Sequence, residues 1–208
     1  MSIRLNGSTS GYTEIDAPAV AGSNTLVLPT GNGSADQALV TNGSGTLSFA
    51  DRGRMTLATA QNSTSGTSID FTGIPSWVKR VTVMFNGVST SGTSAVEARI
   101  GTSSGVESTG YTSAANDGAT VLTSTTGFAL EPAASATAAN LRSGSFVITV
   151  ISSNTWVASG NIYVSSRTLT ESCAGVKSLS GTLDRVRITT VGGTDTFDAG
   201  SINILYEG

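Results

Sequence analysis

The chain has 208 residues, enough for one medium-sized domain and a smaller appendage. Charged residues make up 12% of the sequence, about half of the usual share, and the net charge is −3. This weak negative charge and the scattered Lys and Arg residues exclude the clustered basic surface that nucleic-acid binding requires, so we expect no nucleic-acid partner.

The sequence contains no histidine and a single cysteine, Cys173. A Cys–His dyad, a Ser–His–Asp triad and zinc binding through imidazole are therefore excluded within one chain. A single cysteine also excludes an internal disulfide and disfavours a thiolate metal cluster, so we expect Cys173 to be a small, partly buried apolar residue. We expect no cofactor, no metal ion and no enzymatic activity.

The N-terminal stretch MSIRLNGSTSG lacks the apolar run of about 7–15 residues that defines a signal peptide. No window of the chain approaches the roughly 18–20 apolar residues that span a bilayer. We therefore expect synthesis in a cytoplasm without a signal peptide, and no membrane insertion.

The first fifty residues are poor in apolar side chains and rich in Gly, Ser, Asn and Thr. One hairpin is predicted at 37–50, where QALVT and TLSFA flank an Asn-Gly-Ser-Gly turn. A single hairpin is marginally stable in water, so this region is expected to pack against the same region of other copies, as in an intertwined homotrimer. A polar junction at 51–54, DRGR, divides the chain into an N-terminal attachment or fibre region, 1–52, and a C-terminal β-domain, 53–208.

The second region repeats apolar residues with a period of two, which predicts strands. The runs 81–85 (VTVMF) and 146–151 (FVITVI) are apolar on both faces and are expected to be buried on both sides. In 185–191 (RVRITTV), Val186 and Ile188 should point inward, whereas Arg185, Arg187 and Thr189 should point outward. Further strands are predicted at 161–164 and 202–206, the latter with Ile202, Ile204 and Tyr206 on one face.

Glycine dipeptides punctuate these runs and are typical of tight turns. They are Asn86-Gly87, Ser91-Gly92, Ser143-Gly144, Ser159-Gly160, Gly192-Gly193 and Ala199-Gly200. Several strands separated by turns predict an all-β, antiparallel β-sandwich or jelly roll. The exception is the alanine-rich segment 132–142, PAASATAANLR, which is predicted to be either a short helix or an exposed loop.

Two aromatic residues are weak candidates for ligand binding, because aromatic faces stack on sugar rings. Tyr111, in STGYTS, is expected to lie in an exposed loop, and Trp77 is expected at a rim where the chain enters the strand at 81–85. Packing is the alternative for Trp77. Trp156 is expected to close one end of the sandwich.

Paired carboxylates would be needed for cleavage of a polysaccharide. The candidates are Asp117, Glu131, Asp184, Asp195 and Asp198. Only Asp195 and Asp198 are close in sequence, in GGTDTFDAG, where Asp side chains commonly cap turns. Turn chemistry is therefore favoured over catalysis, and the spacing lacks the dense alternation of a calcium loop.

Three segments resemble proteins of tailed phages. The run SGYTEIDAPAVAGSNTLVLPTGNGSADQALVTNG, 10–43, resembles a short repeat of tail-fibre and other structural proteins. The segments 68–94 and 183–207 resemble a C-terminal domain that is common in phage tail proteins. The resemblance implies a structural virion protein, located in the tail fibre, that docks on tail or baseplate proteins through its N-terminal region and exposes its C-terminal domain. It supplies no functional residues.

Several alternatives remain open for this virion protein. A short fibre or fibre adaptor is the first, and an adhesin that binds a host cell-surface glycan is the second. A head decoration protein and a polysaccharide depolymerase are the others.

Overall fold

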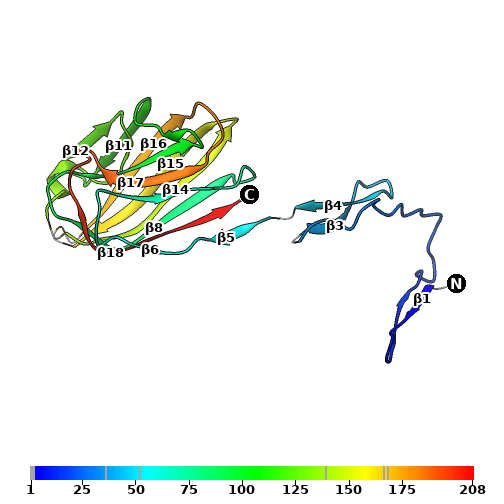
Figure 1. The fold of residues 1–208 in the computed structure, drawn as a ribbon. Helices are drawn as coiled ribbons and strands as arrows, with labels where there is room; N and C mark the ends of the chain where they lie inside the picture. Colours follow the sequence, from blue (N-terminus) through cyan, green and yellow to red (C-terminus); the bar gives the residue numbers. More distant parts are fainter. Residues whose placement is uncertain (1–2, 36, 52, 139, 166, 168) are drawn as a thin grey trace. The chain divides into compact units, whose positions relative to one another are not determined.

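The computed structural model describes residues 3–35, 37–51, 53–138, 140–165, 167 and 169–208. The chain divides into two compact units, Met1–Arg52 and Gly53–Gly208. Strands dominate both units, and the only helical element in the described ranges is one 3-10 turn, Ala133–Ser135 (Figure 1). All pairings between the named strands are antiparallel, which confirms the prediction of an all-β, antiparallel protein.

The N-terminal unit consists of two hairpins. In the first, β1 (Ile3–Asn6) pairs with β2 (Tyr12–Ile15), and in the second, β3 (Gln37–Thr41) pairs with β4 (Leu47–Asp51). The second hairpin is the one predicted at 37–50. Its turn is fixed by the Asn42 side chain, whose Oδ1 accepts hydrogen bonds from the backbone N–H groups of Ser44 (2.8 Å) and Thr46 (3.2 Å).

The larger unit contains a nine-stranded sheet and a five-stranded sheet, which Figure 1 shows as two layers. The nine-stranded sheet has the order β12-β11-β16-β15-β14-β8-β18-β5, and β6 also pairs with β18. Its strands are β5 (Met55–Leu57), β6 (Gln61–Asn62), β8 (Arg80–Thr90), β11 (Tyr111–Asn116), β12 (Val121–Ser124), β14 (Arg142–Ser152), β15 (Thr155–Val164), β16 (Leu169–Ser178) and β18 (Phe197–Glu207).

The five-stranded sheet has the order β10-β9-β17-β7, and β13 also pairs with β9. Its strands are β7 (Ser68–Phe71), β9 (Val96–Thr102), β10 (Gly105–Val106), β13 (Phe128–Ala129) and β17 (Arg185–Thr190). Together the two sheets enclose one hydrophobic core, an arrangement consistent with a β-sandwich. The rings of Phe128 and Phe146, one from each sheet, lie 5.6 Å apart in this core.

Alternation predicted most of the inward-facing residues correctly. Val81, Val83 and Phe85 are buried in β8, Val186 and Ile188 in β17, and Ile202 and Ile204 in β18. Three details were wrong. Neither β8 nor β14 is buried on both sides, because Thr82 and Met84 in β8 and Val147 and Thr149 in β14 are only half-buried, and Ile151 is 61% exposed. Thr189 is buried although alternation places it on the same face as Arg187, and its hydroxyl donates a hydrogen bond to the Thr67 carbonyl (2.9 Å).

Four of the six glycine dipeptides do not form turns but lie inside the long strands β8, β14, β15 and β18. In β8 and β18, Gly87 (φ 62°) and Gly200 (φ 90°) face each other where the register shifts. A side chain on Gly200 would collide with the Gly87 carbonyl. Some bulges and some tight turns use a glycine at positive φ, so the same dipeptide can mark either one.

The segment 132–142 is neither of the two predicted alternatives. One 3-10 turn, Ala133–Ser135, is followed by irregular chain, so a helix along the whole segment was wrong. An exposed loop was also wrong, because Ser135, Ala136 and Asn140 are buried. Ala139 lies outside the described residues.

Candidate functional site

Tyr111 is not the exposed loop residue that the sequence predicted. It begins β11 and is 2% exposed. Its hydroxyl accepts a hydrogen bond from the Ile100 N–H (2.8 Å) and lies 2.9 Å from the Glu107 carbonyl, to which it can donate. Its ring packs edge-on against Phe128, with centroids 5.0 Å apart. Burial raises the pKa of Tyr111. A sugar ring cannot reach this side chain, which instead joins the two sheets.

Replacement of Tyr111 by Phe is expected to lower the free energy of unfolding by about 1–3 kcal/mol, because the buried Ile100 N–H loses its acceptor. Urea unfolding curves of the variant and the parent chain would measure the difference. Tyr163→Phe is the matched control, since Tyr163 is 42% exposed and should change stability by less than about 0.5 kcal/mol. Equal effects at the two positions would contradict a structural role for the Tyr111 hydroxyl.

Trp77 is half-buried and packs against the edge of the core. Its ring centroid lies 5.9 Å from that of Tyr206, and the guanidinium carbon of Arg54 lies 5.5 Å from its ring centre. Part of the ring is therefore held by packing and a cation–π contact. Ligand binding by Trp77 stays a prediction. Trp156 is 3% exposed, as expected for a packing residue.

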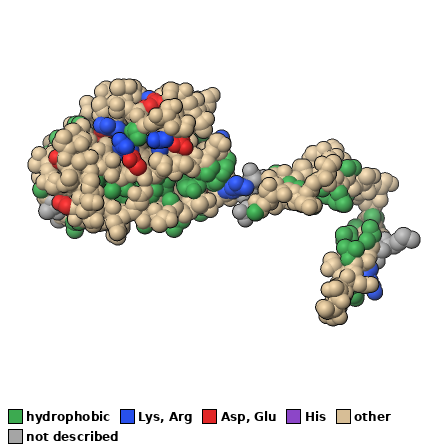
Figure 2. All heavy atoms as spheres, in the orientation of Figure 1, with side chains coloured by type: hydrophobic (Ala, Val, Ile, Leu, Met, Phe, Trp, Pro, Cys, Tyr) green, Lys and Arg blue, Asp and Glu red, His purple; other side chains and the backbone are tan. Residues whose placement is uncertain are grey.

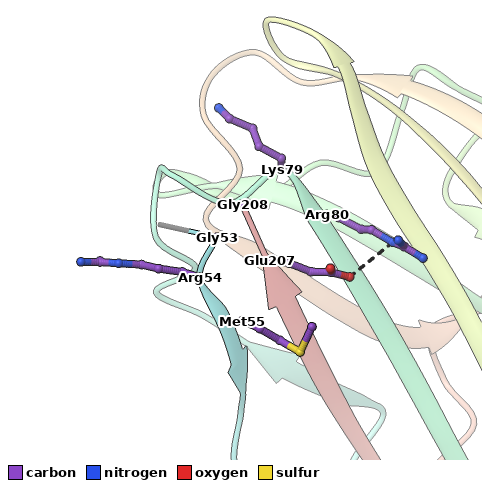
Figure 3. Close-up of a pocket in the computed structure, with 7 residues that line it drawn as sticks. All are labelled: Gly53, Arg54, Met55, Lys79, Arg80, Glu207 and Gly208. Atoms are coloured by element: carbon purple, nitrogen blue, oxygen red, sulfur yellow. Dashed lines mark ion pairs between the residues drawn. The ribbon is translucent and has the colours of Figure 1, made fainter. Parts of the chain in front are cut away.

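A shallow pocket of about 320 Å³ lies beside this cluster and is lined by Gly53, Arg54, Met55, Lys79, Arg80, Glu207 and Gly208. Arg80 Nε lies 3.5 Å from Glu207 Oε1, so one cation is partly neutralised. Figure 3 shows the side chains of Arg54, Lys79 and Arg80 pointing in three different directions. These cations do not converge on one point, and the pocket therefore lacks the geometry that recognition of a small anion requires.

The two carboxylates predicted to cap turns, Asp195 and Asp198, and the further candidate Asp184 all make structural contacts. Asp195 Oδ2 accepts a hydrogen bond from the Ser94 N–H (2.8 Å), and Asp198 accepts one from the Ser89 hydroxyl. Asp184 forms an ion pair with Arg185 at 3.0 Å. Asp195 and Asp184 anchor loops, whereas Asp198 lies in β18 and bonds across to β8, so a turn-capping role was wrong for Asp198.

Asp117 also fixes a turn. Its Oδ1 accepts hydrogen bonds from the backbone N–H groups of Thr120 (2.6 Å) and Ala119 (3.0 Å), and its other oxygen pairs with Arg167. These backbone bonds lower the pKa of Asp117 to about 2. In the part of the chain that the structure describes, no group of three His, Cys, Asp or Glu residues is arranged to hold a metal ion.

Glu131, the remaining candidate carboxylate, belongs to a buried polar cluster that the sequence analysis did not predict. Glu131 Oε2 lies 2.6 Å from Arg142 Nε, and Glu131 Oε1 accepts a hydrogen bond from the Val96 N–H (2.9 Å). Arg142 also donates a hydrogen bond to the Asn140 carbonyl (3.0 Å). Glu171 on β16 is fully buried, and neither of its carboxyl oxygens has a hydrogen bond of normal geometry to the described residues.

Burial raises the pKa of Glu171 to about 7, the nearby Ser135 hydroxyl opposes the rise, and the charge of Glu131 adds to it. Alternation along LTESCAGVKS places Glu171 on the same face of β16 as Cys173 and Lys177, and this pattern could have revealed it. Cys173 is buried, as predicted, and burial raises the pKa of its thiol to about 12.

The largest unexplained feature is the apolar surface of the N-terminal unit, part of which Figure 2 shows in green. Every buried apolar residue in the described ranges belongs to Gly53–Gly208. In contrast, nine large apolar residues of the first unit are at least half exposed. They are Ile3, Leu5, Tyr12, Ile15, Val20, Leu26, Val27, Leu28 and Leu39.

Two hollows in this unit are lined largely by such residues. One, of about 360 Å³, is formed mainly by Val27, Leu28, Pro29, Leu47 and Phe49. The other, of about 400 Å³, includes Ile3, Ile15, Pro18 and Leu26. Isolated exposed apolar residues are common on proteins, but continuous apolar hollows mark interaction surfaces. The N-terminal unit is therefore the best candidate for a functional site, as a surface for assembly.

No protein family, no curated protein and no solved structure matches the chain. Among the described residues, no helix has the length and apolar content needed to cross a membrane.

Proposed function

We propose that the chain is a non-enzymatic structural protein of a tailed-phage virion, a short tail fibre or fibre adaptor. Its N-terminal unit, Met1–Arg52, assembles with other copies, as a homotrimer, and docks on tail or baseplate proteins. The larger unit, Gly53–Gly208, forms a sandwich or jelly-roll domain that faces outward. The assignment to a virion is supported by the likeness of 10–43, 68–94 and 183–207 to phage structural proteins.

The observation that carries the assembly part is the exposed apolar surface of the N-terminal unit. Complete burial of one Val, Leu or Ile side chain contributes about 1.5–3 kcal/mol, so eight such positions together with Tyr12 offer a large driving force for association. A hairpin without a core gains little from folding alone. Packing between identical chains supplies the missing core and repeats each contact by symmetry.

A glycan-binding adhesin is the second candidate, and one observation favours it. Tyr206, which packs against Trp77, lines a pocket of about 250 Å³ at the edge of the sandwich. Thr59, Gln61 and Asp70 supply polar groups to the same pocket. An aromatic face beside fixed polar groups suits one sugar unit.

Limited proteolysis at several protein concentrations tests the assembly function. We expect the N-terminal unit to resist cleavage in concentrated samples and to be cut rapidly after dilution, while the larger unit stays intact in both. Sedimentation equilibrium should give a mass of at least three chains in the concentrated sample. Replacement of Ile3, Ile15 and Leu28 by Ser should abolish the protection, because it removes about 1–2 kcal/mol of burial at each position.

Leu141→Ser and Val191→Ser are the matched controls, because both residues are exposed apolar positions of the larger unit. They should leave the protection unchanged. Resistance of the N-terminal unit in a dilute, monomeric sample would contradict the proposal. Antibodies against the larger unit that fail to label the tails of purified phage particles would contradict the location in the fibre.

A further inference from the structure

The two outer faces of the sandwich differ in charge. On the five-stranded sheet, Asp70, Arg187 and Arg99 lie in one register row across β7, β17 and β9. Arg187 holds Asp70 through two hydrogen bonds of 2.7 Å, and Arg99 pairs with Glu97 at 2.5 Å. Figure 2 shows basic and acidic side chains side by side on the face in view. The Asp70–Arg187 pair joins two neighbouring strands and is partly exposed, as is typical of a face in contact with water.

The outer face of the nine-stranded sheet carries almost no charge. One row of residues that are paired across neighbouring strands runs the whole width of the sheet, from β5 to β12. Its first six residues are Leu57, Leu205, Thr82, Val147, Ser159 and Ala174. The parallel row through Met84 consists of uncharged residues, and the row through Met55 contains only Arg80 and Glu207 as charges. These two lie 3.5 Å apart and offset each other. We call these three rows the neutral face.

Burial confirms the direction in which these rows point. The residues between them along β8, β14 and β18, such as Val83, Ile148 and Ile204, are buried in the core. Ser159, at the centre of the sheet, is exposed, and Leu57 is 62% exposed on the edge strand. Apart from the Arg80–Glu207 pair, the neutral face is therefore a half-buried to exposed surface of Leu, Val, Met, Ala, Ser, Thr and Asn.

The size of this surface is close to that of a stable interface. Eight strands about 4.8 Å apart and three rows about 6.6 Å apart give an area on the order of 600–700 Å². A standard protein interface covers about 800 Å² on each partner, and its centre is depleted in charged residues. The neutral face meets the condition on charge and lies at the lower end of the size range.

We infer that the neutral face packs against a second copy of this chain. The face offers no charge pattern that would select a basic or an acidic partner, whereas an identical sheet supplies the same flat, uncharged surface and the same strand spacing. Two such sheets pack about 10 Å apart with strands nearly aligned. Contact through this face also keeps the ion pairs of the five-stranded sheet in water. The association belongs to the larger unit and does not depend on assembly of the N-terminal unit.

Cysteine labelling tests this inference in the full chain. The chain has a single native cysteine, Cys173, which is buried, so a cysteine introduced on the surface would dominate the reaction with a maleimide. We expect Ser159→Cys to react at least tenfold more slowly in a concentrated sample than after dilution. Ser76→Cys, at an exposed turn outside the neutral face, should react at the same rate in both samples.

A second pair of variants tests the energetics. Ser159→Lys should weaken association at least tenfold in sedimentation, because it places a charge at the centre of the contact. Ser76→Lys should leave association unchanged, and circular dichroism would establish that both variants fold. Equal labelling of Ser159→Cys and Ser76→Cys at all concentrations would overturn the inference. Protection of Ser159→Cys that persists in the dilute monomer would also overturn it, because another part of the same chain would then cover the face.

The proteolysis of the N-terminal unit reports on the proposed function separately. Protection of that unit with equal labelling at Ser159→Cys and Ser76→Cys would refute only the neutral-face contact. Concentration-dependent labelling at Ser159→Cys without protection of the N-terminal unit would refute only the N-terminal assembly.

Discussion

Arg142→Met is expected to lower the free energy of unfolding by about 3–5 kcal/mol, because it leaves a buried carboxylate without its counter-ion. Glu131 is fully buried, and Arg142 is 1% exposed. The Arg142 guanidinium lies 2.6 Å from Glu131 Oε2 and also donates a hydrogen bond to the Asn140 carbonyl. Met fills a similar volume, so loss of the charge dominates over loss of packing. Urea unfolding at pH 7 would measure the change.

A double variant separates the effect of the unpaired charge from the effect of lost packing. Glu131→Gln keeps an oxygen that can accept the Val96 N–H, and combined with Arg142→Met it removes both charges. We expect the double variant to be more stable than Arg142→Met alone. Arg185→Met is the control, because its ion pair with Asp184 is partly exposed and should contribute less than about 1 kcal/mol. A cost for Arg142→Met no larger than for Arg185→Met would contradict the role of the buried pair.

The strands of the larger unit could be predicted because the core imposes a period of two on the sequence. Val81, Val83 and Phe85 show this pattern, as do Ile202 and Ile204, and all five are buried. The pattern does not show where a strand ends. Asn86-Gly87 was therefore interpreted as a turn, although β8 continues to Thr90 through a bulge opposite Gly200.

The burial of Tyr111 could not be predicted from its neighbours. Gly110 and the surrounding Ser and Thr residues are typical of a loop. The Tyr111 hydroxyl can be buried because it has two hydrogen-bond partners, the Ile100 N–H on β9 and the Glu107 carbonyl just after β10. Only the packing of one sheet on the other brings these groups together.

The polar cluster was hidden for the same reason. Glu131 and Glu171 are 40 positions apart, from the difference of their numbers, and no motif connects them. The fold brings them close enough for the Glu131 charge to raise the pKa of Glu171. The lack of a hydrophobic core in the N-terminal unit, in contrast, could be predicted, because it follows from composition alone. Assembly of that unit with other copies stays a prediction.

The buried Glu171 is expected to make the protein less stable as the pH rises from 4.5 to 7. Burial raises the pKa of its carboxyl from 4.5 to about 7, so the folded chain holds a proton there that the unfolded chain has released. The stability that the protonated Glu171 carboxyl contributes is therefore fully present below pH 4.5 and is lost as the pH rises to about 7. The loss at pH 8 should be up to about 3 kcal/mol.

Urea unfolding between pH 4.5 and 8.5 would measure this dependence, and Glu171→Gln should remove most of the slope. The Gln side chain cannot ionise and is almost the same size, so the variant should be more stable than the parent chain above pH 7 and similar to it near pH 4.5. Asp117 does not interfere, because its pKa is lowered to about 2 and its contribution is lost only in more acidic solution.

Glu107→Gln is the control. Burial alone would raise the pKa of Glu107, but hydrogen bonds from Lys177 and Ser180 lower it, so any stability that it contributes is lost below this range and the slope should stay. A Glu171→Gln slope equal to that of the parent chain would mean that the Glu171 carboxyl is ionised in the folded protein at pH 7, and hence that solvent or a cation reaches it.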